Sequence, residues 1–126
     1  MAVSIYWNRC EGETWADLFS VDLEDPHFSG LAGVYMAWLG GPQPAAICVG
    51  SGPIREKLQE LRSAPAVMPF KGKSLLVTWA KVEEGSRSGI ERWLLETLKP
   101  RIAFPPPDAA PLEVNLPGRP GQASPD

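Results

Sequence analysis

Two short apolar runs separated by a Gly/Pro turn constrain this sequence more than any other feature. The first, at residues 34–39, is rich in aromatic side chains, and the second occupies residues 45–49. Between them, residues 40–44 read GGPQP, a composition that suits a turn and interrupts both strands and helices. The pattern predicts an antiparallel hairpin at the centre of the fold.

A helix is expected directly after the hairpin. Apolar side chains recur at spacings of four and three from Ile54 to Leu61, which is the period of a helix with one buried face. We therefore expect a helix over residues 53–61, with Ser51 or Gly52 as its N-cap.

The second half of the chain adds one strand and one further helix. Residues 75–82 are apolar and β-branched with partial alternation, which predicts a third strand. After a polar connection at residues 83–88, an amphipathic helix is expected over residues 90–99, where Pro100 ends it. Three strands and two principal helices in the order β-β-α-β-α indicate an α+β fold.

The N-terminal part is acidic and less regular. Residues 4–7 are expected to form a short strand or an ordered arm, and residues 14–19 a short helix with Thr14 as its cap. His27 is the only histidine, so no Ser-His or Cys-His catalytic machinery can be assembled from this chain.

The composition indicates one domain. A chain of 126 residues with 44% hydrophobic residues and five tryptophans can bury one modest core. We expect an acidic arm and short helix in residues 1–32, packed on a core domain of residues 33–117, and a disordered tail in residues 118–126. Cys10 and Cys48 form no metal-binding pair, and two reduced thiols are expected. Without a membrane-length apolar run or a secretory signal, a cytoplasmic location is expected.

Charge is unevenly distributed along the chain. The net charge of −3 argues against strong non-specific binding of nucleic acid. Residues 1–30 nevertheless hold one arginine against six acidic residues, whereas residues 31–102 hold ten basic residues against six acidic ones. The middle of the chain could therefore present a basic, nucleic-acid-binding face, or a scattered solvated surface. The candidates for the basic face are Arg55, Lys57, Arg62, Lys71, Lys73, Lys81 and Arg87. The residues predicted to bind nucleic acid are Arg55, Lys57, Lys71, Lys73 and Lys81.

Four separated motifs resemble the GIY-YIG nuclease family. They are GVY at residues 33–35, CVG at residues 48–50, IERWLLETLKPRI at residues 90–102 and VNLP at residues 114–117, in the order that the family has them. The resemblance implies a GIY-YIG-like three-stranded antiparallel sheet flanked by helices, and a metal-dependent endonuclease activity.

The resemblance also implies roles for single residues. Tyr35 matches the tyrosine that acts as general base, Glu91 the glutamate that holds a divalent metal such as Mg²⁺ or Mn²⁺, and Asn115 the family's late asparagine. Lys57 stands where the family has an arginine, and a lysine lacks the bidentate fork of arginine. Cys48 stands where the second motif has a tyrosine, a degenerate motif position.

Two of these residues also have purely structural interpretations. Tyr35 could be an ordinary half-buried strand tyrosine with a hydrogen-bonded hydroxyl. Ser88 and Glu91 spell S-x-x-E, the capping box that closes the N-terminus of a helix.

The sequence thus predicts a GIY-YIG-type endonuclease or phosphodiesterase that hydrolyses nucleic acid, with DNA favoured as substrate. The alternative is a catalytically degenerate module of the same fold that binds nucleic acid or a protein partner. A structural accessory protein is a third possibility.

Overall fold

The computed structural model describes residues 4–8, 15–40, 44–102 and 107–116, and it has an α+β architecture. The predicted tail at residues 118–126, Cys10 and Thr14 lie outside the described residues. In chain order the elements are β1 (Ala16–Asp17), a 3₁₀ turn (Pro26–Phe28), β2 (Ala32–Leu39), β3 (Ala45–Pro53), α1 (Ile54–Ser63), a second 3₁₀ turn (Met68–Phe70), β4 (Leu75–Lys81) and α2 (Glu84–Leu98).

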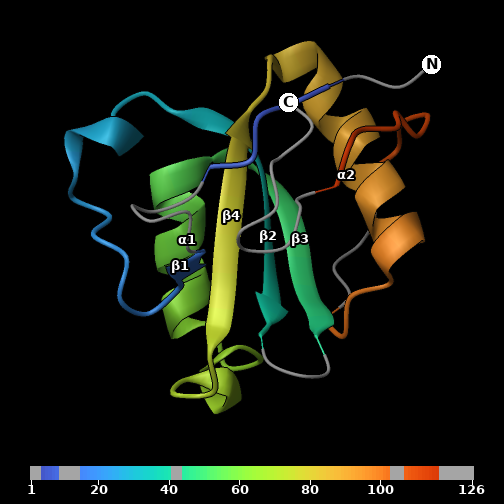
Figure 1. The fold of residues 1–126 in the computed structure, drawn as a ribbon. Coiled ribbons are helices and arrows are strands. Elements are labelled where there is room, and N and C mark those ends of the chain that lie inside the picture. Colours follow the sequence, from blue (N-terminus) through green and yellow to red (C-terminus); the bar gives the residue numbers. More distant parts are fainter. Residues whose placement is uncertain (1–3, 9–14, 41–43, 103–106, 117–126) are drawn as a thin grey trace.

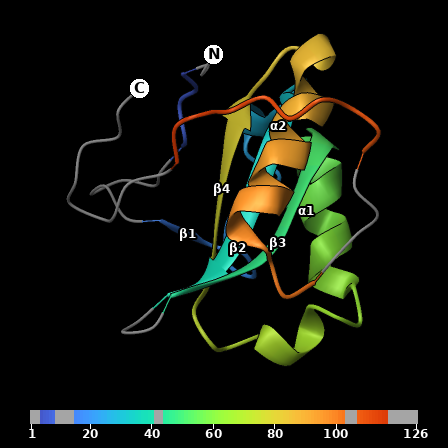
Figure 2. The same cartoon turned by 90° about the vertical axis from the view of Figure 1, so that its right-hand side faces the viewer.

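The strands form one antiparallel sheet in the order β1-β4-β2-β3. The predicted hairpin is formed by β2 and β3, and Tyr35 pairs with Gly50 on β3 and with Trp79 on β4. Figure 1 shows α1 and α2 on opposite sides of the sheet, and Figure 2 shows α2 lying across β2 and β3. Because β3 is the last strand in the order, one of its edges is not paired by another strand.

Alternation along the strands divides the interior into two apolar layers. On β2, Val34 and Met36 pack beneath α2, whereas Tyr35 and Ala37 pack beneath α1. This is the period of two expected of a strand that is covered on both faces. The layer under α1 also contains Ile54, Leu58 and Leu61, and the layer under α2 contains Ile90 and Leu94.

β3 continues four residues beyond the predicted strand at residues 45–49. Gly50, Ser51 and Gly52 stay in register with β2 instead of breaking the strand, and Pro53 is the N-cap of α1. The expectation that Ser51 or Gly52 caps this helix is therefore wrong. The Ser51 side chain bonds to α2 instead.

α2 begins at Glu84, six residues before the predicted start at residue 90. Its first turn is solvent-exposed and polar, so hydrophobic periodicity does not reveal it. Glu83 is the N-cap, and Ser88 lies inside the helix. The capping-box interpretation of Glu91 is therefore wrong, because Glu91 is in the third turn of the helix and not at its N-terminus.

The predicted short helix at residues 14–19 is wrong as well. Ala16 and Asp17 form β1 and pair with Val77 and Leu76, which makes the sheet four-stranded instead of three-stranded. A turn follows at once, because the Asp17 carboxylate accepts a hydrogen bond from the Phe19 N–H at 2.8 Å.

The ends of the described chain are held together by Asn115. Its side-chain oxygen accepts from the Ile5 N–H at 2.7 Å, and its amide nitrogen donates to the Ile5 carbonyl at 2.9 Å. The Asn115 carbonyl accepts from the indole N–H of Trp7, which is fully buried. Residues 4–7 are thus an ordered arm, one of the two predicted forms.

α2 ends at a left-handed residue, Lys99, with φ of 47°. The chain then reverses, and the N–H groups of Arg101 and Ile102 donate to the carbonyls of Ala46 and Ile47. This segment covers the first half of the open edge of β3. In the described part of the chain, no helix has the length and apolarity needed to cross a membrane.

Candidate active site at the edge of the sheet

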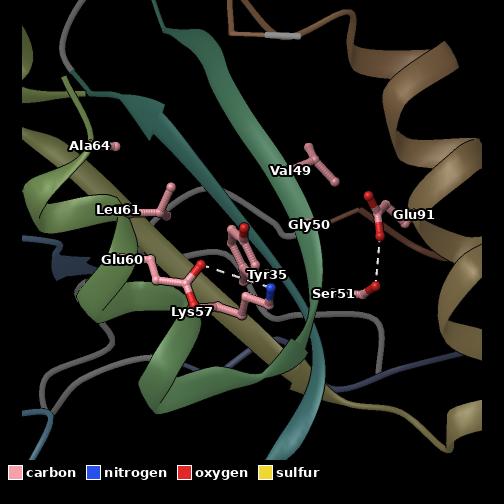
Figure 3. A pocket seen from close by; sticks show the side chains of 9 residues that line it. All are labelled: Tyr35, Val49, Gly50, Ser51, Lys57, Glu60, Leu61, Ala64 and Glu91. Atoms are coloured by element: carbon pink, nitrogen blue, oxygen red, sulfur yellow. Dashed lines mark hydrogen bonds and ion pairs between the residues drawn. The ribbon is translucent and has the colours of Figure 1, made fainter. Parts of the chain in front are cut away.

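A pocket of about 410 Å³ lies at the second half of β3, where the strand runs between α1 and α2 (Figure 3). It gathers three of the predicted site residues from separate elements: Tyr35 from β2, Lys57 from α1 and Glu91 from α2. The complete lining is Tyr35, Val49, Gly50, Ser51, Lys57, Glu60, Leu61, Ala64 and Glu91.

Two glycines of β3 make room for two of these side chains. A Cβ at Gly50 would lie 2.2 Å from the Tyr35 hydroxyl oxygen, so the phenol can cross β3 only over a glycine. A Cβ at Gly52 would lie 2.9 Å from Cε of Lys57, and the φ of +131° at Gly52 is itself unfavourable for other residues. The sequence GSG therefore shapes the pocket floor.

Ser51, between the two glycines, points to the other side of the strand. Its hydroxyl donates a hydrogen bond of 2.6 Å to Oε1 of Glu91 (Figure 3). Within the described residues this is the only hydrogen bond or ion pair of the Glu91 side chain. Glu91 is half-buried, so its carboxylate faces the pocket with one oxygen already bound.

Charge in the pocket is negative on balance. Lys57 faces Glu60 of the same helix, with Nζ and Oε1 3.9 Å apart, and Glu91 adds a second carboxylate. Both members of the Lys57–Glu60 pair are exposed to solvent, so their attraction is weak and screened. One lysine against two glutamates leaves a site that favours a cation over an isolated phosphate.

Tyr35 is 5% exposed, and its hydroxyl has no hydrogen-bond partner among the described residues. Burial raises its pKa well above the ordinary value, and the neighbouring acidic groups of Cys48, Glu91 and Glu60 raise it further. The purely structural interpretation of Tyr35 required a hydrogen-bonded hydroxyl, and no such bond is found among the described residues. Buried hydroxyls are normally bonded, so this one is available to a ligand or a water molecule.

Cys48 is fully buried and does not line the pocket. Burial raises the pKa of its thiol to about 12, so the sulfur is protonated and unreactive at neutral pH. The degenerate motif position therefore adds apolar packing beside Tyr35 and no chemistry.

Asn115 lies outside the pocket. Its side chain is used for the two bonds to Ile5, and the role that the structure supports is to anchor the N-terminal arm. If the family's asparagine position is instead placed directly after the LKPRI sequence, it falls on Ala103, which lies outside the described residues.

The other predicted nucleic-acid-binding residues do not line the pocket either. Arg55 donates to the carbonyls of Leu23 and Asp25, and Lys71 lies 6.0 Å from the ring centre of Phe19. Lys73 and Lys81 are exposed at the two ends of β4. Of the predicted basic face, only Lys57 belongs to the pocket.

Sequence reasoning missed two lining residues, Ser51 and Glu60. Both had a signal: Ser51 directly follows the CVG motif, and Glu60 lies three residues after Lys57, on the same face of the helix. Ser51 was assigned to a helix cap because its glycine neighbours resemble a strand terminator.

A divalent metal fits the chemistry of this site. The described residues contain no cluster of three or more metal-binding side chains, but Mg²⁺ and Mn²⁺ need only one or two carboxylates and keep several waters. Among the described residues, one oxygen of Glu91 and the buried hydroxyl of Tyr35 have no partner, and both side chains line the pocket. All the available donors are oxygens, which hard cations prefer.

Comparisons with protein-family models, curated proteins and solved structures found no match to this chain.

Proposed function

We propose that this protein is a metal-dependent phosphodiester hydrolase of the GIY-YIG type that acts on nucleic acid, with DNA as the first substrate to test. The observation that supports this most is the convergence of Tyr35, Lys57 and Glu91 on one pocket. They come from three elements that are distant in sequence, and the GIY-YIG resemblance had assigned each of them a part in one reaction.

Glu91 would hold the metal. When bound, Mg²⁺ or Mn²⁺ supplies positive charge beside the scissile phosphate and polarises its oxygens. The requirement for such a charge follows from the pocket itself, because Glu60 offsets Lys57 and leaves Glu91 uncompensated.

Lys57 would bind a non-bridging phosphate oxygen. Its ammonium is partly exposed and reaches the pocket over Gly52. A lysine neutralises one charge without fixing the orientation of the phosphate, so the reaction depends more on the metal than it does with an arginine.

Tyr35 would orient the attacking water and accept its proton. A phenol can do so only after losing its own proton, and its surroundings oppose that loss. The negative charge of Glu91 is one of the causes of the raised Tyr35 pKa, and a metal bound to Glu91 would offset that charge. Tyr35 would therefore act as a base only when Glu91 holds a metal.

Cleavage assays with matched variants test the proposal. Labelled single-stranded and duplex DNA and RNA would be incubated with wild type, Glu91→Gln and Glu96→Gln, with Mg²⁺ or Mn²⁺. Glu96 lies on the same helix and pairs with Arg92 outside the pocket. Glu91→Gln should lower the rate by roughly 10²-fold or more, since it removes the metal-holding charge. Glu96→Gln should cleave as wild type does.

Two results would contradict hydrolysis. One is equal cleavage by wild type and Glu91→Gln, which would point to a contaminating nuclease. The other is an absence of cleavage by folded wild type with every substrate and metal.

The second candidate is a degenerate module that binds nucleic acid or a protein without cutting. The position of Cys48 supports it, because a buried thiol replaces a second phenol and leaves Tyr35 as the single tyrosine of the pocket. Anisotropy measurements with labelled oligonucleotides in EDTA would test nucleic-acid binding. A binding module should bind equally with Glu91→Gln and lose affinity as salt is added.

A further inference from the structure

The Ser51–Glu91 hydrogen bond joins the edge strand of the sheet to α2, across 40 positions of sequence. At 2.6 Å it is short, as expected when a hydroxyl donates to an ionised carboxylate. Figure 3 shows that the second carboxylate oxygen of Glu91 points away from Ser51.

The bond limits how Glu91 can bind a cation. A terminal carboxylate turns freely over a broad range, so an unrestrained glutamate can offer one oxygen or both. With Oε1 bound by Ser51, the carboxylate keeps one orientation and presents Oε2 alone.

We propose that Ser51 is a positioning residue that makes Glu91 a one-oxygen ligand and so favours small octahedral cations over Ca²⁺. This inference rests on the proposed function, because it requires a metal on Glu91. Mg²⁺ and Mn²⁺ accept a single carboxylate oxygen among several waters, whereas Ca²⁺ gains from two oxygens of one carboxylate at longer distances.

The packing of α2 does not need this bond. Ile90 and Leu94 are fully buried against the sheet, in the same layer as Val34 and Val49. Ser51 is only half-buried, at the edge of the sheet. A bond that served only to attach the helix would therefore add little to an interface that is already apolar and closed.

Direct metal binding separates positioning from structure. Mn²⁺ binding would be measured by the loss of the free-ion electron paramagnetic resonance signal, and Ca²⁺ binding by competition. The variants are Ser51→Ala, Ser51→Thr, Glu91→Gln and a matched control, Ser86→Ala. Ser86 also donates to a glutamate, Glu83 at 3.2 Å, but outside the pocket.

Ser51→Ala should weaken Mn²⁺ binding roughly 10-fold, as is common when a partner of a metal ligand is removed. Its affinity for Ca²⁺ should fall less, so the preference for Mn²⁺ over Ca²⁺ narrows. Ser51→Thr keeps a hydroxyl at this position of the strand, so its Mn²⁺ affinity and its preference for Mn²⁺ over Ca²⁺ should match wild type. Ser86→Ala should leave both unchanged, and Glu91→Gln should abolish binding.

The outcomes distinguish this inference from the proposed function. If wild type binds Mn²⁺ through Glu91 and cleaves, but Ser51→Ala has the same affinity and the same preference, Ser51 does not position the ligand and the proposed function stands. If wild type binds no Mn²⁺ at millimolar concentration, both are overturned. If Ser51→Ala and Ser51→Thr weaken binding equally, the effect is a structural disturbance and the inference fails.

Discussion

Two hollows among the described residues have nearly the same volume, about 410 Å³ each, and they differ in how their polar groups are used. In the second hollow, between the loop at residues 20–28 and β4, the polar side chains other than Ser20 form hydrogen bonds within the fold. Asp22 and Asp25 accept from backbone N–H groups, and His27 accepts at Nε2 from the indole N–H of Trp79 at 3.0 Å. In the pocket at β3, the Tyr35 hydroxyl has no partner among the described residues, and the Lys57 and Glu60 side chains are 3.9 Å apart.

Volume alone therefore does not distinguish the candidate site from the second hollow. The second hollow contains the histidine and two aspartates, a composition that on its own suggests catalysis, yet these groups shape the loop. The pocket at β3 contains no histidine, but its Tyr35 hydroxyl and one oxygen of Glu91 have no partner among the described residues. Polar groups that the fold does not satisfy are the better indicator of a ligand.

The largest expected effect is a loss of cleavage rate when the pocket at β3, and not the second hollow, is changed. Tyr35→Phe should lower the cleavage rate by roughly 10²–10⁴-fold, the range for loss of a general base. Its free energy of unfolding should stay equal or rise, because the hydroxyl has no described partner to lose. Rates and urea unfolding curves would measure the two quantities.

The paired change in the second hollow is Trp79→Phe. It removes the bond to His27 and part of a side chain that is 4% exposed, so it should cost about 2–4 kcal/mol of stability. Its cleavage rate, measured where it is folded, should match wild type. An equal loss of activity in both variants would show that the second hollow takes part in the reaction.

The next effect concerns stability at the pocket floor. Gly50→Ala should destabilise the fold by about 1–3 kcal/mol, because the new Cβ would meet the Tyr35 ring and force the phenol or the strand to move. Gly85→Ala is the control, since a Cβ there meets nothing within 4 Å and the change, in the first turn of α2, should leave stability equal or slightly higher. Thermal unfolding would check both; a Gly50→Ala protein as stable as wild type would show that Tyr35 does not need the glycine.

Alkaline pH should destabilise the layer beneath α1. The Cys48 thiol has a pKa of about 12 in the fold against 9.0 when unperturbed, so above pH 9 the unfolded chain releases a proton that the folded chain retains. The contribution of this thiol to the free energy of unfolding is thus fully present below pH 9. It declines towards pH 12, by up to about 1.4 kcal/mol per pH unit. Tyr35 acts in the same direction above pH 10.

Urea unfolding at several pH values would measure this decline. For Cys48→Ala, the decline of unfolding free energy above pH 9 should be less steep, because the variant lacks the buried thiol. An identical slope in both proteins would mean that the thiol is less well shielded from water than its burial indicates.

The smallest effect is a gain in activity. Lys57→Arg should raise the cleavage rate a few-fold, about 1 kcal/mol, because a guanidinium can bind a phosphate through two hydrogen bonds. Arg55→Lys on the same helix is the control, since Arg55 binds loop carbonyls beside the second hollow. If Arg55→Lys changes the cleavage rate and Lys57→Arg does not, the phosphate is bound outside the pocket.

The sequence was most informative where side chains are buried on a regular period. β2, β3, β4 and α1 follow from apolar runs and spacings, because each is covered by another layer. The first turns of α2 are exposed and polar, and β1 is two residues long and depends on its pairing with Leu76 and Val77. Neither has a local pattern that could reveal it.

For the candidate site, sequence motifs picked out three residues that share one pocket but did not reveal their surroundings. Tyr35, Lys57 and Glu91 were identified from motifs, and they line one pocket. Asn115 was assigned from a short match in a proline-rich segment, and its contacts with Ile5 depend on a meeting of chain ends that no local pattern encodes. The bond from Ser51 to Glu91 is likewise a long-range contact.

The left-handed turn at Lys99 has a consequence for self-association. By sending Arg101 and Ile102 back along β3, it blocks half of an edge that could otherwise pair with a strand of a second molecule. The other half is flanked by Lys57, Glu60 and Glu91, and charged side chains discourage the docking of a foreign strand. The charged side chains that line the pocket would then also oppose strand pairing between two copies, and replacing both glutamates by neutral residues should increase self-association.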